Sequence, residues 1–101
     1  MSTRDKGRRN ELRARDVLLA AGYDVQMAPM PSRWARQQDL WGLWDLVGIN
    51  AVSIRFVQVK TNKKPSREYT EELAAFVCPA NCTKELWIFK DREPKPLIFV
   101  L

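Results

Sequence analysis

Residues 43–49, LWDLVGI, and residues 54–60, IRFVQVK, are two apolar runs on either side of a short turn. Their content of Val, Ile and Phe predicts two strands, over residues 43–49 and 52–61, joined by a tight turn at 50–51. Each run is interrupted by polar residues at positions that a sheet would bury. An unpaired buried polar group costs about 1–3 kcal/mol and a charge costs more, so residues kept in such places often carry chemistry.

The turn sets the register of this hairpin. With residues 51 and 52 at the tip, paired positions have numbers that sum to about 103. Asp45 then lies opposite Gln58, with Lys60 on the diagonal. Because strand side chains alternate, Gln58 and Lys60 share one face and the valines beside them point to the other. The spacing therefore predicts that three polar side chains converge on one spot.

The rest of the chain predicts two helices and three further strands, from helical spacing of apolar residues, a glycine stop, a serine cap and apolar runs. The helices cover residues 5–21 and 66–78, and the strands cover residues 23–27, 85–90 and 97–101. With the hairpin, the order is α-β-β-β-α-β-β. This order predicts one α/β domain over residues 1–101, with a mixed central sheet flanked by helices.

The net charge of +5 is unevenly distributed. Residues 1–67 hold 13 Lys and Arg against 6 Asp and Glu, a net charge of +7, whereas residues 68–101 hold 4 against 6, a net charge of −2. A basic half of this size favours an anionic polymer as partner, because counterion release grows with the number of phosphates neutralised. The alternative is a charged surface that only keeps the protein soluble.

Several classes of protein are disfavoured by composition. The chain has no histidine, which excludes Ser-His and Cys-His catalytic pairs. Cys78 and Cys82 are too few for a four-ligand zinc site, and we expect reduced thiols rather than a disulfide. No apolar run approaches the roughly 20 residues that span a bilayer. The first residues lead into no apolar signal core, so we expect a cytoplasmic protein with no membrane partner.

The predicted polar cluster has the chemistry of a site for a hard divalent cation. The Asp45 carboxylate, the Gln58 amide oxygen and the Val59 carbonyl are oxygen ligands of the kind that Mg²⁺ takes. Lys60 would position a water or stabilise charge on a phosphate. Glu11, on the inner stripe of the first helix, would add a carboxylate. Two alternatives stay open: an inert buried Asp45–Lys60 pair, and a surface ion pair of Glu11 with an arginine of its own helix.

At these residues the chain resembles the PD-(D/E)XK nucleases, which place an Asp on one strand and (D/E)XK on the next. Here the corresponding residues are Asp45 and the run QVK at 58–60. The nearer resemblance is to the small archaeal-type Holliday junction resolvases and their phage or bacterial relatives. Residues 6–11, KGRRNE, are similar to the KGxxxE-like start of that group, and residues 28–32, APMPS, to its AP-x-S loop.

The resemblance implies a restriction-endonuclease-like fold and a metal-dependent DNA endonuclease, directed to branched or junction DNA in recombination or repair. It implies Mg²⁺ or Mn²⁺ as cofactor and a homodimer, since resolving a junction takes two symmetric cuts. The implied catalytic residues are Glu11, Asp45, Gln58, Lys60 and Ser32, and the implied metal ligands are Asp45, Gln58, Val59 and Glu11.

Basic residues near these motifs are candidates for contacts with DNA phosphates. An arginine pair beside a tryptophan, at residues 33–36, is suited to stacking on nucleic acid. Gly7, one helical turn before Glu11, would let a phosphate approach closely. The predicted DNA-binding residues are Lys6, Arg8, Arg9, Arg33, Arg36, Lys63 and Lys64.

Two departures from the family pattern bear on activity. Trp44 stands where proline often precedes the aspartate, and Gln58 replaces an acid, which removes a negative charge from the metal site. Asp39 is the nearest acid that could compensate. The alternative function is therefore a catalytically silent nucleic-acid-binding module with a nuclease-like fold. A third is a small protein-interaction domain that uses exposed tryptophans.

Overall fold

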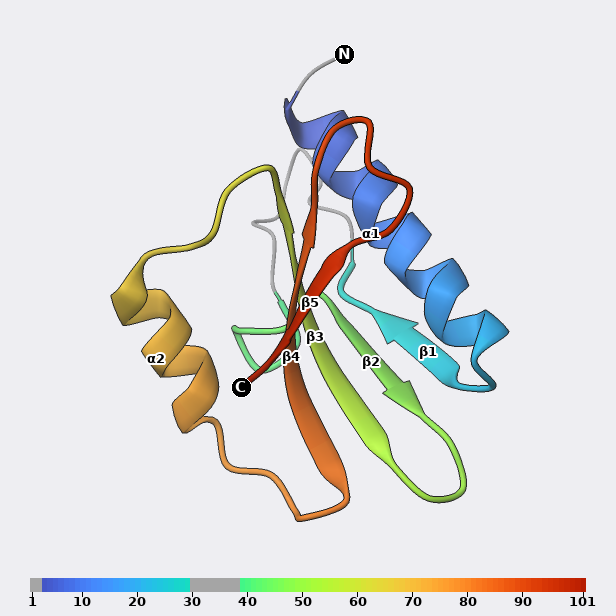
Figure 1. Ribbon diagram of the computed structural model, residues 1–101. Coiled ribbons are helices and arrows are strands. Elements are labelled where there is room, and N and C mark those ends of the chain that lie inside the picture. The colour runs from blue at the N-terminus through green and yellow to red at the C-terminus, as the bar shows by residue number, and fades with distance from the viewer. Residues whose placement is uncertain (1–2, 30–38) are drawn as a thin grey trace.

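Five strands form one mixed sheet in the computed structural model, which describes residues 3–29 and 39–101 (Figure 1). They lie in the order β1-β2-β3-β4-β5, and neighbours are antiparallel except for the parallel pair β3 and β4. The strands are β1 Asp24–Met27, β2 Leu46–Ile49, β3 Ile54–Thr61, β4 Cys82–Phe89 and β5 Leu97–Val100. With helices α1 Thr3–Ala20 and α2 Arg67–Ala75, they make an α/β fold.

The hairpin of β2 and β3 has the predicted register. Leu46 pairs with Val57 and Ile49 with Ile54, so the numbers of paired residues sum to 103. Asn50 shapes the turn, because its side-chain oxygen accepts hydrogen bonds from the backbone N–H groups of Val52 and Ser53, each at 2.9 Å. This local turn therefore determines which polar side chains of the two strands can meet.

The predicted start of the first hairpin strand, at residue 43, is wrong. β2 begins at Leu46, because residues 40–44 fold into a tight turn closed by a bridge between Leu40 and Trp44. Trp41 and Gly42 adopt φ values of 53° and 69° in this turn. Such left-handed backbone ends strand geometry, and it is unusual for a residue with a side chain as large as that of Trp41.

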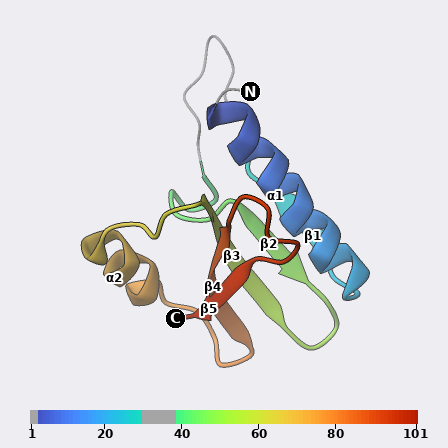
Figure 2. The ribbon, with the colours of Figure 1, turned by 45° about the horizontal axis from the view of Figure 1, so that its top comes forward.

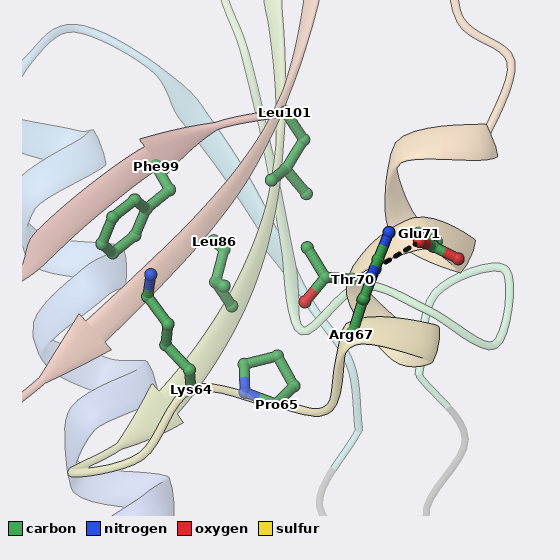
Figure 3. A pocket seen from close by; sticks show the side chains of 8 residues that line it. All are labelled: Lys64, Pro65, Arg67, Thr70, Glu71, Leu86, Phe99 and Leu101. Atoms are coloured by element: carbon green, nitrogen blue, oxygen red, sulfur yellow. Dashed lines mark hydrogen bonds and ion pairs between the residues drawn. The ribbon is translucent and has the colours of Figure 1, made fainter.

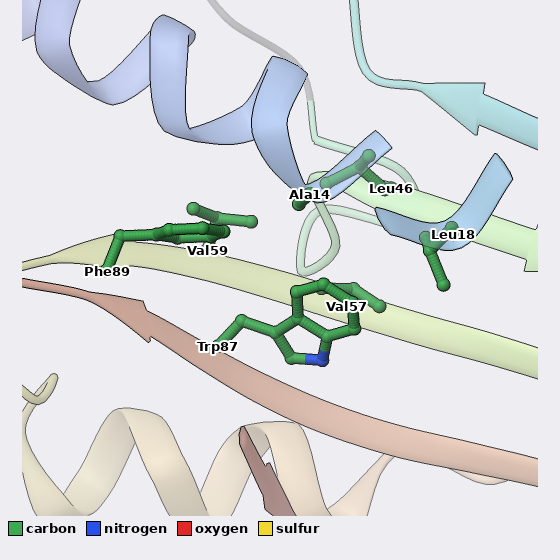
Figure 4. Packing of buried hydrophobic residues seen from close by; sticks show 7 residues of the cluster. All are labelled: Ala14, Leu18, Leu46, Val57, Val59, Trp87 and Phe89. Atoms are coloured by element: carbon green, nitrogen blue, oxygen red, sulfur yellow. The ribbon is translucent and has the colours of Figure 1, made fainter. Parts of the chain in front are cut away.

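Helix α1 packs on one face of the sheet (Figure 4). Its buried Ala14 and Leu18 meet Val57 and Trp87 in a core cluster that continues over this face. Gly48 allows the close approach of the helix end, because a Cβ there would lie 3.4 Å from Leu18 Cδ1 and 3.3 Å from the Cβ of Tyr23. The sequence therefore holds this helix against the sheet through small residues as well as large ones.

Helix α2 covers the opposite face of the sheet (Figure 2). Ser66 caps it as predicted, since its hydroxyl accepts a hydrogen bond of 3.1 Å from the N–H of Tyr69. The predicted end near residue 78 is too late, because Phe76 leaves the helix in an extended conformation. The Phe76 ring then packs on Trp44 and Phe56, with centroid separations of 5.5 and 5.0 Å.

Strand β4 begins at Cys82, three residues before its predicted start. Its first residues are polar, and the parallel pairing with β3 over residues 82–89 extends the strand through them.

Further along β4, Glu85 is buried beside Arg55 of β3, whose guanidinium donates to both carboxylate oxygens at 2.7 and 2.8 Å. Trp87 Nε1 also donates to Glu85, at 3.0 Å. Burial raises the pKa of Glu85, but these bonds outweigh it and hold the pKa below its ordinary value.

Cys78 and Cys82 carry free thiols. Across the part of the chain that the structure describes, no helix combines the length and the apolar character needed to cross a membrane.

Candidate metal and phosphate site

One polar hollow of about 430 Å³ collects the predicted catalytic and metal-binding residues that the structure describes. It lies between the first half of α1, the segment before β2, the end of β3 and the start of α2. Its lining residues are Gly7, Glu11, Asp39, Asp45, Gln58, Val59, Lys60, Thr61 and Tyr69. The hairpin register thus brings Asp45, Gln58 and Lys60 together, and α1 adds Glu11.

Asp45 is held at the bottom of the hollow by the neighbouring strand. The residue is only 4% exposed, and its Oδ2 accepts a hydrogen bond of 2.8 Å from the backbone N–H of Val59. The backbone N–H of Asp45 donates in turn to the carbonyl of Val57 at 2.9 Å. The carboxylate is therefore fixed by β3 rather than by its own loop.

Gln58 is only 3% exposed, and its carboxamide lies between Asp45 and Tyr69 of α2. On one side of the carboxamide are two acceptors, the Leu43 carbonyl oxygen and Oδ2 of the ionised Asp45 carboxylate. On the other side is the Tyr69 hydroxyl, which can donate or accept. The amide nitrogen therefore donates to Leu43 at 3.0 Å and to Asp45 at 2.8 Å, while the amide oxygen accepts from Tyr69 at 3.1 Å. In this state Gln58 meets Asp45 as a hydrogen-bond donor.

Burial and neighbouring acids raise the pKa of Asp45 to about 7. Loss of solvent is the largest cause, and the carboxylates of Glu11 and Asp39 add to it. The hydrogen bond from Val59 and the charge of Lys60 oppose the shift without cancelling it. Because these nearby carboxylates repel one another when ionised, a bound cation would be favoured among them.

Glu11 is both a site residue and the partner of an arginine on its own helix. Its side chain is 14% exposed and lies 3.2 Å from the guanidinium of Arg8, an arginine of its own helix. Burial nevertheless raises the pKa of Glu11. The helix is anchored next to it by Asn10, which is buried and donates to the Thr61 hydroxyl at 2.8 Å. This contact places Glu11 over the end of β3.

Tyr69 is a site residue that the sequence did not identify. Its spacing with Leu73 is that of an apolar stripe on a helix, but its hydroxyl reaches Gln58 and its ring lies 5.0 Å from the ammonium of Lys60. Burial and nearby acids raise the pKa of Tyr69 to about 12, so the phenol is protonated at neutral pH. The Ser66 cap in the sequence indicates where α2 begins and therefore which residues share a face of the helix. It does not indicate that this helix lies over the hollow.

The donor set suits a hard cation that keeps much of its water. Within residues 3–29 and 39–101, no three Asp, Glu or Cys side chains come close enough together to hold a metal ion. Mg²⁺, however, usually takes only one or two carboxylates from a protein, along with waters and substrate phosphate. Asp45 and Glu11 could supply the two carboxylates and Val59 a carbonyl oxygen, whereas Gln58 turns its amide nitrogen toward Asp45.

The predicted DNA-binding residues are placed differently from one another. Lys6 and Arg8 have acidic partners within the protein, Asp91 at 3.0 Å and Glu11 at 3.2 Å. Lys64 lies at a second hollow of about 460 Å³, where its ammonium is 4.5 Å from the ring of Phe99 (Figure 3). Arg9 and Lys63 are exposed, and Ser32, Arg33 and Arg36 fall outside the described residues.

The chain was compared with models of protein families, with curated proteins and with solved structures, and none of the three comparisons gives a match.

Proposed function

We propose that this protein is a metal-dependent DNA endonuclease with a restriction-endonuclease-like fold, directed to branched DNA as the Holliday junction resolvases are. One observation carries the proposal. An acid, a backbone carbonyl and a lysine of one hairpin meet a glutamate of a separate helix in one polar hollow. These groups come from distant parts of the chain, and the hollow leaves room for a phosphate.

The residues have distinct roles in the hydrolysis of a phosphodiester. Asp45 and the Val59 carbonyl would hold Mg²⁺ or Mn²⁺, with Glu11 beside them. The bound cation would supply charge for the scissile phosphate and acidify a water. Lys60, at the same hollow, orients the attacking water and stabilises the negative charge on phosphorus-bound oxygens. The water oxygen bonds to phosphorus as the bond to the leaving sugar oxygen breaks, and the proton that the water gives up ends on the leaving oxygen.

The helix surface at Gly7 provides an open approach to these groups. A Cβ at this position would have no neighbour within 4 Å, and Gly7 itself lines the hollow. A phosphate can therefore come close to the α1 backbone one turn before Glu11. Lys63 is exposed just after the end of β3, where its ammonium would contact a phosphate of the DNA strand next to the site.

A panel of defined substrates tests this function. The protein is incubated with four-way junction, flap and linear duplex DNA, each with Mg²⁺, with Mn²⁺ and with chelator. We expect cation-dependent cleavage that is fastest on branched DNA. Cleavage in the presence of chelator, or hydrolysis of none of the substrates, would contradict the proposal.

A junction resolvase also needs two active sites, so we propose a homodimer. Sedimentation of the protein alone and with junction DNA measures the number of copies. Paired, symmetric cuts by a dimer are the expected result. A monomer that introduces single nicks would remove the resolvase assignment while leaving endonuclease activity in place.

A catalytically silent DNA-binding module is the second candidate, and the orientation of Gln58 favours it. The amide nitrogen faces Asp45, so the site lacks the second negative oxygen of a standard PD-(D/E)XK centre. This candidate predicts salt-sensitive DNA binding without cleavage. Gln58→Glu would then create cleavage, whereas strong cleavage by the natural sequence would reject the candidate.

A further inference from the structure

The Gln58 carboxamide can take two orientations at one position, and only the first gives both of its polar atoms a suitable hydrogen-bond partner. In the first, described above, its nitrogen donates to Leu43 and Asp45 and its oxygen accepts from Tyr69. In the second, its nitrogen donates to the Tyr69 hydroxyl, at the same 3.1 Å, and its oxygen faces the Leu43 carbonyl and Asp45 Oδ2. A phenol can donate or accept, so Tyr69 serves both orientations.

The second orientation brings three oxygens together and needs a positive charge to hold them. In it, the Gln58 oxygen lies 2.8 Å from Asp45 Oδ2 and 3.0 Å from the Leu43 carbonyl. Neighbouring ligands of an octahedral Mg²⁺ at 2.0–2.1 Å are themselves roughly 2.9 Å apart. The spacing that serves a hydrogen bond in the free protein is therefore also the spacing of two ligands of one ion.

We propose that the Gln58 carboxamide turns over when a divalent cation binds, and that Tyr69 is the positioning residue that holds it in both states. Without a cation, the amide nitrogen neutralises part of the charge of Asp45. With a cation, the amide oxygen becomes a ligand and the nitrogen is held by the Tyr69 oxygen. This inference rests on the proposed metal-dependent function, and it explains how a glutamine can stand where an acid is usual.

Tyr69 matters more for the cation-bound orientation than for the free one. In the free protein, removal of the phenol leaves the amide oxygen without a donor, but both N–H groups keep their acceptors. In the cation-bound orientation, removal leaves a buried NH₂ group without its acceptor. Unpaired buried N–H groups are tolerated less well than carbonyl oxygens. Tyr69→Phe should therefore weaken cation binding.

Calorimetric titration with Mg²⁺ alone tests the inference. Tyr69→Phe should weaken binding roughly 3- to 10-fold, the effect of one hydrogen bond. Tyr23→Phe is the matched control, because that hydroxyl binds Ser53 away from the hollow; it should bind like the wild type. Equal binding by wild type and Tyr69→Phe would overturn the inference.

A crystal structure with bound Mg²⁺ gives the second readout. The Gln58 oxygen should lie about 2.1 Å from the ion. A bound ion with the Gln58 nitrogen still on Asp45 would overturn the inference and leave the endonuclease proposal intact. If no variant binds Mg²⁺, the inference fails, and the cleavage panel decides the endonuclease proposal separately.

Discussion

At the scale of single residues, the buried acids Glu85 and Asp45 are held in opposite ways. Glu85 has an arginine, a tryptophan and a threonine as donors, and its pKa is lowered. Asp45 has one backbone and one amide donor beside further acids, and its pKa is raised to about 7. The first is satisfied by the fold, whereas the second is left in need of a positive charge. This contrast separates a structural acid from a candidate ligand.

Asp45 should make stability fall as the pH rises. Its pKa in the folded protein, about 7, is above the ordinary value of 3.8, so the folded state holds the proton more tightly than the unfolded state. The contribution of the Asp45 proton to the free energy of unfolding, at most about 4 kcal/mol, is fully present below pH 4. It is lost as the pH rises through about 7. Asp45→Asn should remove this dependence and be the more stable protein at pH 8, as measured by urea unfolding at pH 5 and 8. Parallel pH dependence in the two proteins would argue against the shift.

Glu85 predicts the opposite sign. Its pKa in the folded protein is lowered from 4.5, so its contribution is present above that pH and is lost as the pH falls. Arg55→Met leaves the buried carboxylate without its ion pair and should cost about 3–5 kcal/mol at pH 7. Adding Glu85→Gln should recover part of the loss in the same unfolding assay. A single substitution that costs under about 1 kcal/mol would show that the pair is not structural.

At the scale of elements, the site depends on how closely α1 approaches the sheet. Gly48 of β2 gives room for Leu18 and Tyr23, while Gly7 of α1 faces open space at the hollow. Glycine is therefore suited to the two positions for different physical reasons. One permits packing and the other exposes helix backbone where we place a phosphate.

Alanine substitutions separate these reasons. Gly48→Ala places a Cβ 3.3 Å from that of Tyr23 and should destabilise the protein by about 1–3 kcal/mol. Gly7→Ala lies within a helix without a clash and should stabilise by about 0.5–1 kcal/mol while weakening DNA binding. Thermal unfolding and a DNA-binding titration on both variants measure this. A stabilised Gly7→Ala with unchanged DNA affinity would exclude phosphate approach at that turn.

At the scale of the whole molecule, the local features of the sequence predicted more than the non-local ones. The Asn50 turn and the two-residue period were enough to place Asp45 near Gln58, because both act within the hairpin. The start of β4 was missed, since its polar first residues are strands only through pairing with β3. Tyr69 was missed as a site residue for a similar reason. The position of α2 over the hollow depends on a non-local contact, in which Phe76 at the end of α2 packs on Phe56 of β3.

The basic half of the molecule should make DNA binding depend on salt. Each phosphate neutralised contributes about −0.9 to the slope of log K against log salt on duplex DNA. Lys63→Gln, at an exposed residue past the end of β3, should reduce the slope by about one unit. Arg15→Gln is the control, because Arg15 pairs with Asp16 at 2.9 Å further along α1. Equal slopes for the two variants would remove Lys63 from the DNA path.

The most direct test of the central claim is the initial rate of DNA cleavage by Asp45→Asn, measured with Mg²⁺ on the substrate that the wild type cuts fastest. Asp24→Asn, which alters an exposed acid of β1, is the matched control. If Asp45 is the site's cation-binding carboxylate, its loss should slow cleavage by at least about 100-fold, while the control cleaves like the wild type. Equal rates for Asp45→Asn and the wild type would contradict the assignment of the active site to this hollow.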